Sequence, residues 1–214
     1  MTAPRTDIER TLFDWRIYAE ATCAGLSALL PIPLVDVAFE WFFRRRMPKT
    51  TAKLRDERLA FGAAGELSRS AGKGSVLGGC LRLPVGVVRY TLSKLWRKVI
   101  YVFAVTDAAT QTSEYWHRAY LLDHVIKAGH AGPDVDWERS IRIFDKVLAE
   151  TDTSPLLNLA QQTVSSAKRV VCMLVRARRS DAAEETESLS KILGSNWDVA
   201  EASLIEVAIR YNEE

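Results

Sequence analysis

The feature that most constrains the fold of this chain is an uncharged run of fifteen residues, Ala21 to Val35, which two prolines interrupt near its end. Proline has no amide hydrogen and disfavours helical geometry in the residue before it, so Pro31 and Pro33 must bend the chain. The run is also shorter than the roughly 20 apolar residues that a membrane-spanning helix needs. We therefore predict a bent pair of helices here, which leaves shallow contact with a membrane open but disfavours a crossing.

Helical periodicity dominates the remaining sequence, and no segment alternates as a strand beside a hairpin turn would. The predicted fold class is all-α: a single helical bundle-like domain (residues 1–214) of seven to nine helices with a Pro-x-Pro elbow. The glycine-rich stretch 70–79 is the one plausible hinge between an N-terminal and a C-terminal half. The predicted helices span about 6–30, 34–46, 49–61, 63–69, 85–105, 107–128, 134 or 136 to 150, 154–178 and 181–212, with a break at 194–196.

Charge is strongly segregated along the chain, although the formal net charge is only +2. Residues 44–98 contain fourteen Lys or Arg and three Asp or Glu, a net charge of +11. Residues 181–214 contain two and nine, a net charge of −7. The basic block needs an anionic neighbour, which is lipid, nucleic acid or the chain's own acidic C-terminal segment. Its heavy apolar content fits lipid or a protein groove better than the DNA major groove, so nucleic acid is the less favoured partner.

Two segments that combine basic and aromatic residues are the candidate contact sites. The sequence WFFRRR at 41–46 closes an apolar helix, and residues 89–105 form a basic amphipathic helix. Aromatic anchors beside Lys and Arg are typical of a helix at the interface of an anionic membrane, although a core helix with a solvated end has the same pattern. The candidate membrane- or partner-contact residues are Trp41, Phe42, Phe43, Arg44, Arg45, Arg46, Lys94, Trp96, Arg97 and Lys98.

No pattern in the sequence nominates a catalytic residue, a metal site or a cofactor. His117, His124 and His130 lie six or seven residues apart, and seven helical residues span about 10 Å, too far for two ligands of one metal ion. Asp36 and Glu40 share a helix face, but Glu40 precedes an arginine by four residues, which favours an ordinary ion pair over acid–base chemistry. Three widely spaced cysteines and a charged N-terminus favour a cytoplasmic protein with reduced thiols.

The stretch ALLPIPLVD, followed by a basic helix and AFGAAGELSR, resembles a family pattern between Ala24 and Arg69. It is similar to helical membrane-associated domains of bacteria that are grouped with EcsC-like proteins and with accessory domains of Era- and dynamin-like GTPases. In those domains a helix of small residues runs into Pro-x-Pro-x-x-Asp and then into an Arg-rich amphipathic helix. The resemblance implies that Pro31, Pro33 and Asp36 form a structural elbow with no catalytic role.

These features favour a non-enzymatic cytoplasmic protein that associates peripherally with the inner face of an anionic membrane through a basic and aromatic surface. The alternative is a soluble helical adaptor that binds another protein, with the apolar elbow buried in its core. Exposure of Trp41, Phe42 and Trp96 favours the membrane, whereas burial of these side chains favours the adaptor. An enzyme is the third interpretation, and no reaction is nominated for it.

Overall fold

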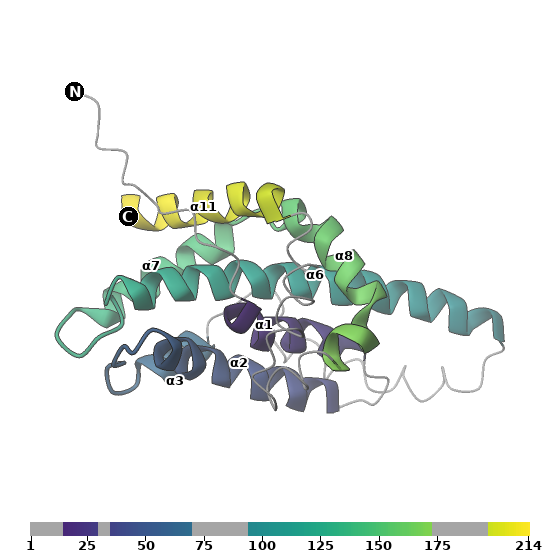
Figure 1. The fold of residues 1–214 in the computed structure, drawn as a ribbon, viewed down its shortest axis with the longest axis horizontal. Coiled ribbons are helices and arrows are strands. Elements are labelled where there is room, and N and C mark those ends of the chain that lie inside the picture. Colours follow the sequence, from purple (N-terminus) through teal and green to yellow (C-terminus); the bar gives the residue numbers. More distant parts are fainter. Residues whose placement is uncertain (1–14, 30–34, 70–93, 173–196) are drawn as a thin grey trace, which may run out of the picture.

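The computed structural model describes residues 15–29, 35–69, 94–172 and 197–214, and these residues form helices and turns without any strand. The all-α prediction is therefore confirmed. Figure 1 shows the long helix α6 (Lys94–Lys127) as the axis of the molecule, with the other helices packed around it. They are α1 (Trp15–Leu26), α2 (Val35–Leu54), α3 (Ala63–Arg69), α7 (Trp137–Glu150), α8 (Leu157–Ser165) and α11 (Trp197–Glu213), with 3-10 helices η1 (Ser27–Leu29) and η2 (Ser154–Leu156).

Helix α2 corrects the prediction that one helix ends at Arg46 and another begins at Lys49. The structure has one continuous helix, which runs through Pro48. An interior proline costs about 3 kcal/mol because it removes one helical hydrogen bond and crowds the preceding turn. Pro48 is buried together with Met47, Thr51 and Ala52, so packing against the core offsets this cost.

Helix α6 corrects a second predicted break, which placed separate helices before and after Thr106. Its 34 residues are continuous and correspond to about 51 Å of helix. The polar residues at the predicted break do not stop it, because the Thr110 hydroxyl donates to the Thr106 carbonyl within the helix at 3.1 Å. Such back-bonding satisfies a polar side chain without ending the helix.

Helices α1 and α6 approach closely because small residues line the surface between them. A Cβ atom on Gly25 would lie 2.3 Å from Oγ1 and 2.5 Å from Cα of Thr112, so only glycine fits at this position. One turn away, the indole nitrogen of Trp116 donates to the Thr22 hydroxyl at 2.9 Å. Since residues later in α1 meet residues earlier in α6, the two helices are antiparallel.

The C-terminal helices follow the predictions in part. Asp136 caps α7 as predicted, since its carboxylate accepts from the Arg139 amide at 3.1 Å. The helix predicted to begin at residue 154 opens instead with η2, and the Asp152 carboxylate accepts from the Ser154 amide at 3.0 Å. Helix α8 ends at Ser165, and after a turn at Ser166 residues 167–172 are helical again, so the predicted helix is interrupted there; its predicted end near residue 178 lies outside the described residues. Of the predicted helix 181–212, the part after the break is confirmed by α11, whereas residues 181–196 lie outside the described residues.

One buried cluster joins helices from both sides of residues 70–93. Arg118 of α6 donates to the Leu67 carbonyl of α3, and its guanidinium lies 5.5 Å from the Phe144 ring of α7. The Arg55 guanidinium forms a bidentate pair with the Asp123 carboxylate, at 2.7 and 2.8 Å, which ties the end of α2 to α6. The predicted elbow prolines Pro31 and Pro33 and the predicted hinge at 70–79 lie outside the described residues.

Candidate membrane-contact surface

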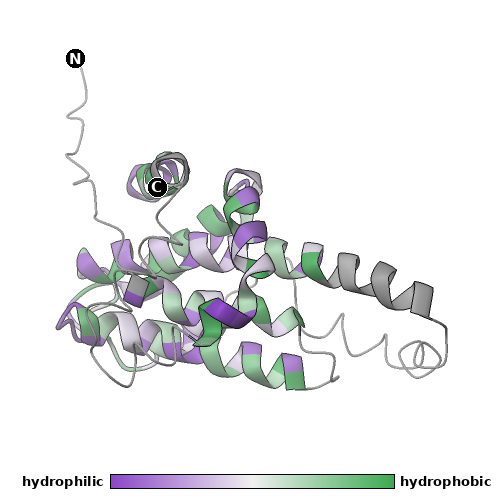
Figure 2. Cartoon of the chain, turned by 45° about the vertical axis from the view of Figure 1, so that its right-hand side comes forward, coloured by the Kyte–Doolittle hydropathy of each residue, from purple (hydrophilic) through white to green (hydrophobic). Residues whose placement is uncertain are grey.

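Three aromatic side chains on the N-terminal half of α2 are about half exposed: Phe39 by 48%, Trp41 by 51% and Phe42 by 46%. We call these three residues the aromatic edge. Phe43 differs from them, because it is only partly exposed and packs against the core cluster. Its ring contacts the Phe39 and Phe42 rings at centroid distances of 6.0 and 5.3 Å, so Phe43 connects these two rings to the core cluster. Figure 2 shows hydrophobic and hydrophilic residues mixed along α2.

The three predicted contact arginines have three different environments. Arg44 faces inward and pairs with Glu40 at 3.8 Å, with 18% of its side chain exposed. Arg46 lies 3.4 Å from the buried carboxylate of Glu20, and its guanidinium covers the Phe42 ring at 5.2 Å. Arg45 is exposed and lies 5.0 Å from the Trp41 ring. Among the described residues no carboxylate lies within ion-pair distance of Arg45, so its charge is available to a partner outside the protein.

Glu40 holds the aromatic half of α2 against α6. The Tyr115 hydroxyl donates to the Glu40 carboxylate at 2.5 Å. Burial, reinforced by this carboxylate, raises the pKa of Tyr115 well above its usual value, so the tyrosine keeps its proton. Asp36 accepts from the Val37 amide at 2.8 Å in the first turn of α2, where the helix dipole favours an anion. Both carboxylates therefore have structural partners and do not form an acid–base pair.

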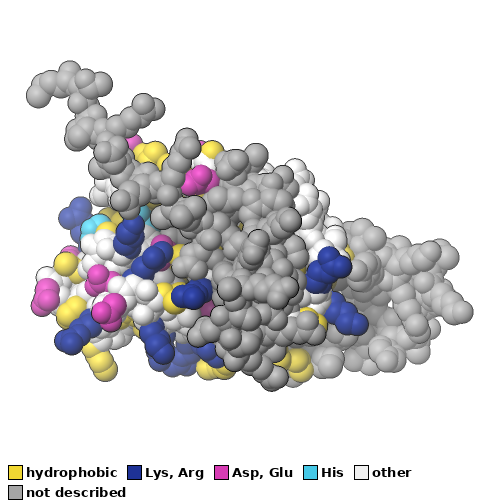
Figure 3. Space-filling model, viewed as in Figure 1, with side chains coloured by type: hydrophobic (Ala, Val, Ile, Leu, Met, Phe, Trp, Pro, Cys, Tyr) yellow, Lys and Arg dark blue, Asp and Glu magenta, His cyan; other side chains and the backbone are white. Residues whose placement is uncertain are grey.

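Beyond Pro48, α2 carries two exposed lysines that the sequence prediction did not include. Arg45, Lys49 and Lys53 are all exposed and follow one another at four-residue steps, which turn by about 40° around the helix. We call these residues the cationic stripe. Trp41 lies one further step before Arg45, so this one residue of the aromatic edge continues the row of the stripe. Dark blue Lys and Arg side chains mix with yellow hydrophobic ones along the lower edge of Figure 3, where Figure 1 places α2.

The second predicted contact segment lies at the start of α6. The backbone of Lys94, Trp96, Arg97 and Lys98 is helical, but their side chains lie outside the described part of the chain. The Glu40–Tyr115 and Arg55–Asp123 contacts show that α2 and α6 run in the same direction. Lys98 precedes Tyr115 by 17 residues, or about 26 Å of helix. The two predicted halves of the contact surface are thus separated along α6.

The acidic C-terminal segment, as far as it is described, does not cover α2. Helix α11 packs against α6, α7 and η2. Figures 1 and 2 agree that it lies on the opposite side of α6 from α2. Residues 181–196 lie outside the described residues. The acids of α11 therefore do not neutralise the cationic stripe.

The three histidines each have partners within the protein. His117 is buried, its Nδ1 lies 2.8 Å from the Ser113 carbonyl, and burial lowers its pKa. His124 and His130 face the last turns of α11, where Nδ1 of His130 lies 3.2 Å from the Tyr211 hydroxyl. Within the described ranges, no three His, Cys, Asp or Glu side chains are grouped closely enough to hold a metal ion.

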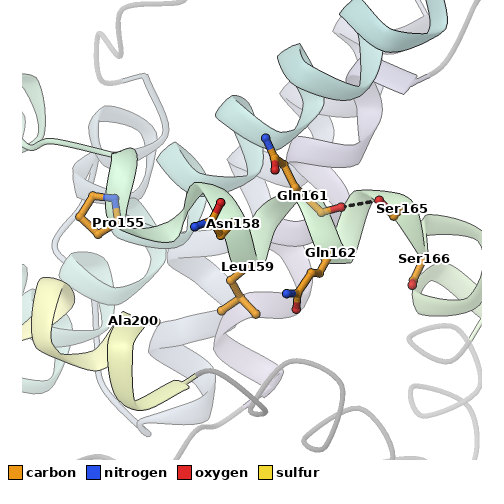
Figure 4. A pocket seen from close by; sticks show the side chains of 8 residues that line it. All are labelled: Pro155, Asn158, Leu159, Gln161, Gln162, Ser165, Ser166 and Ala200. Carbon is orange, nitrogen blue, oxygen red and sulfur yellow. Dashed lines mark hydrogen bonds between the residues drawn. The ribbon is translucent and has the colours of Figure 1, made fainter. Parts of the chain in front are cut away.

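An open pocket of about 740 Å³ lies between α8 and the start of α11, as Figure 4 shows. Among the described residues that line it, none is titratable. The Ser165 hydroxyl, the obvious candidate for a nucleophile, donates to the Gln161 carbonyl at 2.8 Å, and the described lining residues include no basic side chain that could activate it. The lining residues are Pro155, Asn158, Leu159, Gln161, Gln162, Ser165, Ser166 and Ala200.

Of the helices that are described, none combines the length and the apolar character that a membrane crossing requires. No protein-family model, no curated protein and no solved structure matches this chain. The surface of α2 is therefore assessed from its own geometry and charge.

Proposed function

We propose that this protein is non-enzymatic and associates peripherally with an anionic membrane surface, on its cytoplasmic face, through the exposed side of α2. The observation that carries the proposal is the aromatic edge, where three large apolar side chains are about half exposed within about one helical turn. Trp and Phe beside Arg suit the membrane interface, where rings enter the acyl boundary and guanidinium groups stay with the headgroups.

The transfer free energy of the aromatic edge is sufficient for reversible binding. A Phe or Trp side chain has about 150–250 Å² to bury, so half exposure leaves about 100 Å² on each of the three. At about 25 cal/mol per Å² each ring contributes at most about 2.5 kcal/mol on transfer from water. Since Arg45 adds attraction to anionic lipid, the surface fits a protein that binds and leaves a membrane.

The weak family resemblance between Ala24 and Arg69 agrees with this proposal, and we retain membership of the EcsC-like group as part of it. A helical adaptor is the second candidate, because an exposed apolar and basic surface also suits a protein partner. Exposure of Trp41 and Phe42 supports the membrane over an adaptor that buries this region in its own core.

The experiment is co-sedimentation of the full chain with vesicles of phosphatidylcholine, with and without phosphatidylserine. We expect binding to the anionic vesicles only, and weaker binding as salt shortens the screening length from about 10 Å at 0.1 M. The Trp41→Ser/Phe42→Ser variant should lower the partition coefficient at least tenfold, because it removes more than the 1.4 kcal/mol that a factor of ten requires.

The matched control is Val135→Ser/Ile209→Ser, which removes two apolar side chains that are 43% and 41% exposed away from α2. This variant should bind like the unmodified protein. Equal losses in the two variants would mean that general surface hydrophobicity drives sedimentation. Absence of binding to any vesicle at low salt would reject the membrane and leave the adaptor.

A further inference from the structure

The cationic stripe lies on the exposed side of α2, and no carboxylate of the described residues lies within ion-pair distance of it. The helix contains only two acids, Asp36 and Glu40, and Glu40 is turned toward Tyr115 of α6. The next exposed acids, Asp56 and Glu57, follow the helix. In the described part of the chain, neither lies within ion-pair distance of Lys53.

The two arginines that flank Arg45 in the sequence pair with carboxylates of the protein itself. Arg44 pairs with Glu40 on the inner side of α2. Arg46 pairs with Glu20, whose side chain is only 2% exposed. Withdrawing a cation from a buried carboxylate is strongly unfavourable. Of the three consecutive arginines, only Arg45 can therefore engage an external anion without disturbing the core.

We propose that Arg45, Lys49 and Lys53 form the headgroup-binding site of this protein and that α2 lies flat along the membrane, rather than entering it end-on. The inference rests on the proposed membrane function and identifies the residues and orientation that would serve it. Successive cations are about 6 Å apart along the helix and span about 12 Å. This row is complementary to the phosphates of an anionic phospholipid surface, and Trp41 at its end enters the interface.

The order of residues along α2 fits this orientation. The aromatic edge occupies the first half of the exposed face and the cationic stripe the second half. A helix parallel to the surface brings both halves to the lipid at once. A helix that entered end-on through the aromatic edge would leave Lys53 about 18 Å from Trp41 along the axis, beyond the screening length of about 8 Å at physiological salt.

The test uses the full chain with three exposed cations replaced, Arg45→Gln/Lys49→Gln/Lys53→Gln. Each basic residue near an anionic surface contributes roughly a fivefold factor in affinity, so the triple variant should bind phosphatidylserine vesicles on the order of 100-fold more weakly. The matched control is Arg139→Gln/Arg142→Gln/Lys168→Gln, which removes the same charge from exposed positions outside α2. A charge-preserving variant, Lys49→Arg/Lys53→Arg, should retain binding.

The outcomes are distinct. Selective loss in the stripe variant, with retention in the control and in the charge-preserving variant, supports the proposal. Equal weakening of both triple variants would reject it in favour of a net-charge effect. Unchanged binding of the stripe variant would also reject it, while the membrane function through the aromatic edge would stand. If the unmodified protein binds no vesicle, the proposed function itself fails, and the stripe is left to an acidic protein partner.

Discussion

Replacing Gly25 with alanine should separate α1 from α6, because the added methyl group meets backbone as well as a side chain. Its Cβ would lie 2.3 Å from Oγ1 of Thr112, 2.5 Å from Cα and 2.8 Å from the amide nitrogen. Favourable carbon contacts require about 3.5 Å or more, so α6 must move away by about 1 Å. The small residues packed nearby, including Ala108 and Ala109, then lose neighbours.

The expected cost follows from two opposing effects. Overpacking of a core costs about 1–3 kcal/mol, and the upper end applies here because a helix backbone cannot rotate away as a side chain can. Alanine recovers about 1 kcal/mol of helix propensity relative to glycine. The net destabilisation is therefore about 2 kcal/mol, which for a chain of this size lowers the thermal midpoint by roughly 4–8 °C.

The assay is urea and thermal unfolding followed by far-ultraviolet circular dichroism. Gly65→Ala is the matched control, because a Cβ there meets nothing within 4 Å. It should be neutral or stabilising by up to about 1 kcal/mol. Adding Thr112→Ala to Gly25→Ala should restore only part of the stability, since it removes the clash with the threonine hydroxyl but leaves the clash with the α6 backbone. Equal stability of Gly25→Ala and Gly65→Ala, or complete rescue, would refute the reasoning.

Two further predictions concern buried polar groups. Tyr115→Phe removes the donor to Glu40, whose side chain is only 13% exposed, and should cost about 1–3 kcal/mol in urea unfolding; unchanged stability would show that Glu40 finds another donor. Burial lowers the pKa of His117, so the folded state binds fewer protons than the unfolded state, and stability is lost as pH falls below about 6.5. His117→Asn should flatten this part of the stability–pH profile, and an identical slope in both proteins would contradict it.

The sequence predicted the helical class well because it depends on local periodicity and caps. Asp136 satisfies an amide three residues away, so a short window reveals the start of α7. The predicted breaks at Pro48 and Thr106 were wrong because a helix break depends on tertiary packing as well as on local sequence. Whether a proline or a polar pair ends a helix depends on what packs against it, and α1, which packs against both α2 and α6, lies outside the few residues that a local pattern covers.

The candidate site, too, was predicted from the sequence only in part. The aromatic residues and Arg45 stood out as the motif WFFRRR, but the false break at Pro48 concealed the four-residue spacing of Arg45, Lys49 and Lys53. The motif also treated three arginines as equivalent. They differ because Glu20 belongs to α1, and the ion pair between Arg46 and Glu20 exists only once α1 and α2 are packed.

The sequence by itself determined that this chain is helical, that its charge is segregated, and that WFFRRR carries aromatic rings beside cations. These are properties of residues and near neighbours, which composition and spacing record directly. Only the tertiary structure decided which side of α2 is exposed, which arginine stays available, and that α11 packs across α6 from the cationic stripe. Burial and ion pairing depend on interactions between residues distant in the chain, and no local pattern specifies them.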